Sequence, residues 1–219
     1  MVRVDDFSDL SSQLTAVKIT SIKQQVKNPE RVSIFVNGKY EFSLSLDELI
    51  KYKLKNNDEL DKADIKKFKK ISADGKLRAR VLEWLLNRPH SEREFKDYLF
   101  RKKVEPEQIE SLVSEMTQKG YLDNAKFAAW FTELQARRGK SDRAISAELF
   151  KKGIGREAAN EVLETGAGDE ADRLKVVIEK KKRLGRYKDD NEKLAKYLTS
   201  QGFSWQLVKE ELLTNREDT

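Results

Sequence analysis

The chain has 219 residues, of which 44 are Lys or Arg and 38 are Asp or Glu, and it contains one His and no Cys. Without Cys there are no disulfides, thiolate nucleophiles or Cys-based zinc or iron–sulfur sites, and a single His excludes a two-His zinc site. The net charge of +6 suits an anionic partner but identifies none. No apolar run approaches the roughly 20 residues that span a bilayer, and the acidic, polar N-terminus does not resemble a signal peptide. We therefore expect a cytoplasmic protein.

The first part of the chain has the pattern of a small β module. We expect residues 1–14 to be flexible and residues 16–25, 31–36 and 39–44 to form three antiparallel strands, because apolar and polar residues alternate along them. Asn37-Gly38 is the strongest short hairpin signal, since both central residues of a type I′ turn need positive φ. Ser45 is placed to cap a helix that ends near Asn57. The module with this helix is predicted to span residues 15–60.

From about Asp61 onward, apolar residues recur at helical spacing, and we expect about nine helices of 10–18 residues. Five glycines each follow an apolar-periodic segment, where a left-handed residue commonly ends a helix. They are Gly120, Gly139, Gly153, Gly185 and Gly202.

The helical part repeats itself about every 50 residues. Residues 91–104, 141–154 and 190–203 align without a gap, and their apolar positions coincide, as Phe95, Ile145 and Leu194 show. Self-similarity at such a period indicates a tandem array. We therefore predict a mainly α protein in which three three-helix repeats, at residues 61–120, 121–166 and 167–219, form an elongated curved body behind the β module.

No motif for nucleotide binding or hydrolysis is present. His90 lies at a polar helix start, where the sequence shows no obvious setting of carboxylate and nucleophile for a catalytic base. Asp123, Asp142 and Asp190 also lie near helix starts, where capping and the helix dipole explain them without a metal. We expect no catalytic, cofactor-binding or metal-binding residues and no enzyme, with a carboxylate-only, metal-dependent nuclease as the alternative.

Basic clusters occur at matched places in the repeats. A solvated helix face, or cations near the negative end of the helix dipole, is the simpler explanation. A row of cations along an array would also suit a phosphate backbone or an acidic protein groove, and the run from Lys180 to Lys188 contains no acid. Trp84, Trp130 and Trp205 fall one per repeat, and we expect them to pack in or between repeats and not to stack on bases.

Three stretches resemble the RecX family, bacterial regulators of the RecA recombinase. They read Arg88-Pro-His-Ser-Glu-Arg-Glu94-Phe, Gly120-Tyr-Leu-Asp123-Asn-Ala-Lys-Phe127-Ala128 and Arg138-Gly139-Lys-Ser-Asp-Arg143-Ala-Ile145. The resemblance is closest over residues 70–165, and the β module is similar to an extension of longer family members. Where the family usually has a second Asp after Asp123, this chain has Asn124.

The resemblance implies a regulator that binds in the groove of the RecA filament on DNA. It would inhibit or modulate recombinase, ATPase and co-protease activity in DNA repair and the SOS response. The implied partners are this filament and, mainly through it, DNA, with no membrane and no cofactor, and we expect a monomer. The alternative is a general DNA-binding or architectural protein that acts without the recombinase.

On this hypothesis the partner-binding residues are the cations of the repeats. They are Arg88, Arg93, Arg101, Lys102, Arg138, Lys140, Arg143, Lys152, Lys180, Lys181, Lys182, Arg183, Arg186 and Lys188. Ser91 and Ser141 are expected to be helix N-caps, with Glu94 completing a capping box in the first repeat. Phe127 and Ala128 are expected in the core.

Overall fold

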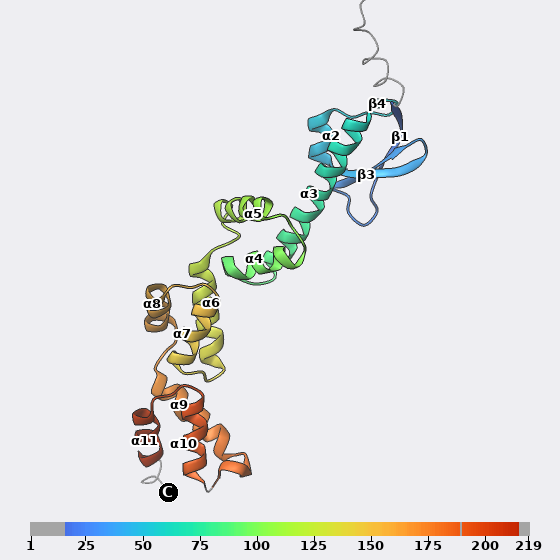
Figure 1. The fold of residues 1–219 in the computed structure, drawn as a ribbon. Coiled ribbons are helices and arrows are strands. Elements are labelled where there is room, and N and C mark those ends of the chain that lie inside the picture. Colours follow the sequence, from blue (N-terminus) through green and yellow to red (C-terminus); the bar gives the residue numbers. More distant parts are fainter. Residues whose placement is uncertain (1–15, 189, 215–219) are drawn as a thin grey trace, which may run out of the picture. The chain divides into compact units, whose positions relative to one another are not determined.

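Figure 1 shows the fold in a computed structural model, which describes residues 16–188 and 190–214. The chain divides into two compact units, residues 1–84 and residues 85–219, and each is taken here by itself. The described residues form ten α-helices and one four-stranded sheet, so the prediction of a mainly α protein with an N-terminal β module is confirmed. No helix in this part of the chain is long and apolar enough to cross a membrane. The segment predicted to be flexible, residues 1–14, lies outside the described residues.

The first unit contains an antiparallel sheet in the order β3-β2-β1-β4. Its strands are β1 (Val17–Gln24), β2 (Arg31–Val36), β3 (Lys39–Ser45) and β4 (Glu59–Leu60). The three predicted strands are confirmed, but the prediction of a three-stranded module is wrong by one strand. β4 has two residues, paired with Val17 and Lys18, and two residues are too few to show an alternating pattern.

Local turn and cap chemistry explains how this unit is connected. Asn37 has φ 50° and Gly38 has φ 77°, the positive values that the predicted type I′ turn requires. Ser45 caps α2 (Leu46–Tyr52) through a full capping box with Glu48. The helix ends at Tyr52 because the next residue, Lys53, is left-handed at φ 53°, so the predicted end near Asn57 is too late.

The core of the first unit lies between the sheet and helices. Ile19, Ile34 and Leu44 are fully buried on the sheet. Phe68, from α3 (Lys62–Leu86), stacks on Phe42 with ring centroids 5.4 Å apart. At 25 residues, α3 is longer than the 10–18 residues expected of any helix.

The helices from α3 onward repeat one sequence of elements. A longer helix is followed by a helix of ten residues and then by a third helix. After α3 come α4 (Glu92–Arg101) and α5 (Pro106–Gln118), then α6 (Asn124–Arg137), α7 (Asp142–Lys151) and α8 (Arg156–Gly166), and then α9 (Glu170–Lys182), α10 (Asn191–Ser200) and α11 (Trp205–Thr214). Residues 91–100 and 141–150 also show the same order of buried and exposed positions, as expected if both segments present the same face to their neighbours.

Four of the five glycines predicted to end helices are left-handed. Gly120, Gly139, Gly153 and Gly202 have φ values of 71°, 74°, 83° and 96°. The prediction is wrong for Gly185, which starts a short 3₁₀ turn, η1 (Gly185–Tyr187), after α9 has already ended.

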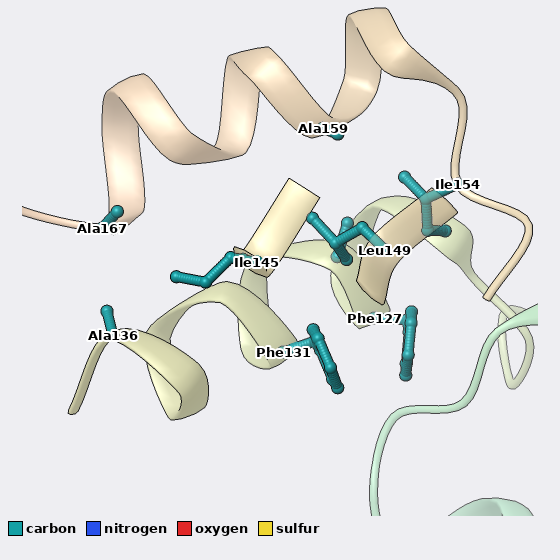
Figure 2. Close-up of a cluster of buried hydrophobic side chains, with 9 residues drawn as sticks. Phe127, Phe131, Ala136, Ile145, Leu149, Ile154, Ala159 and Ala167 are labelled. Carbon is teal, nitrogen blue, oxygen red and sulfur yellow. The ribbon is translucent and has the colours of Figure 1, made fainter. Parts of the chain in front are cut away.

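The middle three helices enclose a well-defined core, which Figure 2 shows in close-up. Phe127 and Phe131 of α6 stack with ring centroids 5.6 Å apart. Ile145 and Leu149 of α7 are fully buried against them, and α8 closes the cluster with the small side chain of Ala159. Phe127 and Ala128 are both fully buried, which confirms their predicted place in the core.

Candidate partner-binding surface

One carboxylate joins cations from two repeats. Glu94 Oε2 accepts a hydrogen bond from Arg88 at 3.0 Å and lies 3.3 Å from His90 Nδ1, and its Oε1 accepts from Lys152 Nζ at 2.7 Å. The Glu94 side chain is 13% exposed. Arg88 and His90 directly precede α4, whereas Lys152 follows α7, so this cluster connects the first repeat to the second.

The two cations fix the charge of Glu94. Burial raises the pKa of the Glu94 carboxyl, but hydrogen bonds and positive charge from Arg88 and Lys152 outweigh burial and hold the pKa below its ordinary value of 4.5. Arg88 also lies over the Trp130 ring, with its guanidinium carbon 5.1 Å from the ring centroid. Two of the predicted partner-binding cations, Arg88 and Lys152, therefore act within the chain as well.

This arrangement corrects the predicted capping box. Ser91 does cap α4 by accepting from Glu94 N at 3.1 Å, and Ser141 caps α7 in the same way. The reciprocal half is not formed at α4 in the described part of the chain, because the Glu94 side chain reaches the cations instead. Sequence spacing alone does not separate these two uses of a Glu at the third helical position.

A second contact between repeats involves Asn124, the first residue of α6. Asn124 Oδ1 accepts from Glu92 N, at the start of α4, at 2.9 Å. This contact needs an acceptor oxygen and no negative charge, so the amide of Asn124 serves it.

The other predicted cations lie mostly at helix ends. Arg93 and Arg143 are exposed at the same place in α4 and α7. The remaining described members are exposed or half-buried: Arg101, Lys102, Arg138, Lys140, Lys180, Lys181, Lys182, Arg183 and Lys188. Arg138 and Lys180 line one groove, and Lys181 Nζ lies 4.5 Å from the centroid of the Tyr197 ring. The side chain of Arg186 lies outside the described residues.

Two exposed aromatic residues were not among the predicted site residues. Phe100 and Phe150 occupy the same position in two repeats and are 75% and 68% exposed. Phe150 lines a groove of about 420 Å³ together with Arg143, Lys151 and Arg156. The sequence carried this signal, because each Phe directly follows the fully buried Leu99 or Leu149 and so falls outside the buried stripe of its helix.

The tryptophans do not all pack as expected. Trp84 and Trp130 are half-buried, and the guanidinium of Arg88 lies over the ring of Trp130. Trp205 is 59% exposed at the first position of α11, so the prediction of a packed side chain is wrong there.

The acidic residues at helix starts have structural partners. Asp123 caps α6 by accepting from the backbone N–H groups of Lys126 and Ala125, which lowers the pKa of its carboxyl despite some burial. Asp190 caps α10 by accepting from Lys193 N at 2.8 Å, and Asp142 pairs with Arg173. Among the residues that the structure describes, no three His, Asp or Glu side chains are grouped so that they could hold a metal ion.

Comparison with known proteins decides the family. A model described as the regulatory protein RecX N-terminal domain matches residues 17–61, and one described as the RecX second three-helix domain matches residues 123–163. Regulatory protein RecX of Listeria innocua is 31% identical over 198 residues, which cover 88% of this chain and 74% of that protein. Regulatory protein RecX of Bacillus subtilis is 30% identical over 211 residues, covering 92% and 80% of the two chains.

The chain belongs to the RecX family.

Solved RecX structures share the fold. A crystal structure of regulatory protein RecX superposes with a TM-score of 0.64 at 24% identity, over 88% of this chain and 97% of that one. RecX from Lactobacillus salivarius gives a TM-score of 0.54 at 17% identity, over 64% and 94% of the chains. The RecX N-terminal domain coincides with the β module, and the second three-helix domain coincides with α6, α7 and α8. RecX proteins are regulators and not enzymes, in agreement with the prediction of no enzyme.

Proposed function

We propose that this protein regulates a RecA-type recombinase by binding in the groove of the recombinase–DNA filament. The observation that carries the proposal is the membership of the chain in the RecX family of regulatory proteins, at 31% identity over 88% of its length. In this proposal the protein acts in the cytoplasm as a monomer and inhibits or modulates the recombinase, ATPase and co-protease activities of the filament during DNA repair and the SOS response.

The repeats supply surfaces suited to a filament. Arg93 and Arg143 are exposed at the same position of α4 and α7, and neither has an ion-pair partner among the described residues. A filament presents the same surface again at each protomer, so equivalent cations of two repeats can meet equivalent groups. Such contacts act jointly, because once the first has formed the second becomes an intramolecular event.

Cations that hold the chain together are unsuitable for testing this surface. Reversing Arg88 or Lys152 would leave the buried Glu94 without one of its two partners and would disturb the fold. The variant of choice is therefore Arg93→Glu with Arg143→Glu. A matched control is Lys193→Glu with Lys209→Glu, which changes the net charge equally at two exposed lysines of the third repeat.

The experiment measures ATP hydrolysis and strand exchange by a RecA recombinase on DNA as the concentration of the full chain is increased. We expect the wild-type protein and the control variant to inhibit, and the Arg93→Glu, Arg143→Glu variant to need on the order of tenfold more protein for the same inhibition. Absence of any effect of the wild-type protein would overturn the function. Equal inhibition by the two variants would overturn the assignment of Arg93 and Arg143 to the surface that contacts the filament.

A further inference from the structure

The two junctions between successive repeats carry the same arginine in different surroundings. By the alignment of the repeats, Arg138 corresponds to Arg88, and Ala144 corresponds to Glu94. At the first junction Glu94 accepts from both Arg88 and Lys152. At the second junction Ala144 offers no carboxylate, and Arg138 has no ion-pair partner among the described residues.

The second junction opens into a groove lined by four cations and no acidic residue. Its volume is about 270 Å³, and its lining residues are Ala136, Arg137, Arg138, Gly139, Arg173, Val176, Val177 and Lys180. Arg137 pairs with Glu133 and Arg173 pairs with Asp142, neither of which lines the groove. Arg138, the C-cap of α6, and Lys180, in α9, are exposed and have no such neutralising partner within the described ranges.

The groove is held in shape by packed groups. The side chain of Arg173 is only 10% exposed, and it donates to the carbonyls of Ala167 and Gly168 as well as to Asp142. Gly139 is left-handed at φ 74°, and Val177 approaches it so closely that a Cβ at this position would overlap the valine. A site whose walls are already ordered loses less entropy when it binds a ligand.

The chemistry of the lining selects the class of ligand. Guanidinium and ammonium groups without acids favour an anion, and the guanidinium fork matches a phosphate or carboxylate. The volume lies below the roughly 300–1,000 Å³ of pockets for drug-sized molecules. The positive charge continues from Lys180 through Arg183 to Lys188 with no acid in between, which suits a polymer with regularly spaced charges.

We propose that the groove between the second and third repeats binds the phosphodiester backbone of a DNA strand, with Arg138 and Lys180 as its two phosphate contacts. The inference rests on the proposed function, which places the protein on a filament that contains DNA. It adds that this groove contacts the DNA of the filament. The first junction, where Glu94 neutralises the equivalent arginine, is not a phosphate site.

The test is binding of the full chain to a fluorescein-labelled single-stranded oligothymidine, followed by fluorescence anisotropy at several salt concentrations. Arg138→Glu with Lys180→Glu is compared with the control Lys193→Glu with Lys209→Glu, which changes the net charge equally. We expect the groove variant to lose on the order of tenfold in affinity, and the slope of log K against log salt to fall by about 1.4, because each lost phosphate contact on a single strand contributes about 0.7. The control variant should stay within about threefold of the wild-type protein and keep its slope.

Three results would overturn the inference: no binding of the oligothymidine by the wild-type protein, equal losses in the two variants, or tighter binding of a polyglutamate peptide of matched charge that the groove variant abolishes. The last would assign the groove to acidic protein. Recombinase inhibition measured on the same samples separates the two proposals. If the wild-type protein inhibits the recombinase but does not bind the oligothymidine, the DNA-binding groove is refuted and the regulatory function stands. If the protein binds DNA through the groove but does not inhibit the recombinase, the regulatory function is refuted and the DNA-binding groove stands.

Discussion

Glu94 receives hydrogen bonds from two cations that lie 64 residues apart in the sequence, Arg88 before α4 and Lys152 after α7. A carboxylate that is 13% exposed loses most of its hydration, and this loss is compensated only while both partners remain in place. The ion cluster therefore stabilises the contact between the first and second repeats as long as Glu94 is charged.

Replacing Glu94 by Gln should destabilise the protein in a pH-dependent way. At pH 7 we expect a loss of about 1–3 kcal/mol, because two hydrogen bonds lose their charged acceptor. Arg88 and Lys152 lower the pKa of Glu94 in the folded protein. The stability that these two ion pairs contribute is therefore complete above pH 4.5, the ordinary pKa of the carboxyl, and is lost as the pH falls through the lower pKa of the folded state. Urea unfolding of both proteins between pH 7 and the acid range measures this difference.

The control for this prediction is Glu110→Gln, which removes a carboxylate that is 67% exposed and pairs with Lys96. Its cost should be below about 1 kcal/mol, as for other surface pairs. A Glu94→Gln cost that stays constant with pH would show that the cluster does not depend on the carboxylate charge.

Lys103 holds a conformation that the other repeats give to glycine. It corresponds to Gly153 and Gly202 in the alignment and is left-handed at φ 58°. We expect Lys103→Gly to raise the free energy of unfolding by about 1 kcal/mol. The left-handed conformation costs a residue with a side chain about 1–2 kcal/mol, and glycine avoids this cost. Part of the gain is lost because glycine gives the unfolded chain more conformational entropy. Lys102→Gly, at the neighbouring position with φ −82°, should instead lower it by about 0.5–1 kcal/mol. Thermal unfolding of the two variants decides, and a Lys103→Gly variant no more stable than wild type contradicts the prediction.

Left-handed glycines at the helix ends also allow successive repeats to approach one another. A Cβ at Gly153 would lie 3.1 Å from Arg93 Cβ in the preceding repeat, and one at Gly202 would overlap Ser141 Oγ. Ser141 in turn donates to the carbonyl of Gln201 at 2.9 Å. These glycines thus have two functions, ending a helix and giving room to the repeat before it. Lys103 belongs to the first of the three repeats, and within the described residues the segment before that repeat is the β module.

The two functions of these glycines are separable with a pair of alanine substitutions. Gly120 and Gly139 have nearly equal φ, 71° and 74°, but a Cβ at Gly120 meets no atom within 4 Å, whereas one at Gly139 overlaps Val177. We expect Gly120→Ala to cost about 1–2 kcal/mol for conformation alone and Gly139→Ala to cost about 1–3 kcal/mol more for the displaced valine. Equal losses in urea unfolding would show that α9 moves away from Gly139 without cost.

Local sequence signals predicted the elements well, and contacts made across long sequence separations explain the missed strand β4 and the wrong capping box at Glu94. The positive φ of Asn37 and the capping by Ser141 follow from residues within a few positions. The Glu94 cluster and the close approach at Gly139 depend on residues of the next repeat, which one repeat does not contain. β4 is missed because its pairing with β1, and not its own two residues, makes it a strand.

The total of 44 Lys and Arg residues overstates the number of cations available to a partner. Arg88, Arg137, Lys152 and Arg173 are paired within the second unit. Charge alone therefore distinguishes poorly between cations that hold the repeats together and cations that face a partner. The ion pairs of the structure separate these two groups and leave Arg93, Arg138 and Arg143 as candidates whose reversal tests binding without disturbing the fold.

The exposed aromatic pair provides a test that is independent of charge. Phe100 and Phe150 occupy equivalent repeat positions at 75% and 68% exposure, so replacing both by Ala should change the stability by less than about 0.5 kcal/mol for each substitution. If a repeating filament surface covers them, each contributes apolar contact area, and aromatic residues are among the common anchors of interfaces. We expect inhibition of the recombinase to need on the order of tenfold more of the double variant, and an intermediate amount of each single variant.

The control is Ile50→Ala, at an isoleucine of α2 that is 71% exposed, and this variant should inhibit as the wild-type protein does. Full inhibition by the double variant would show that the repeats contact the filament through a different face.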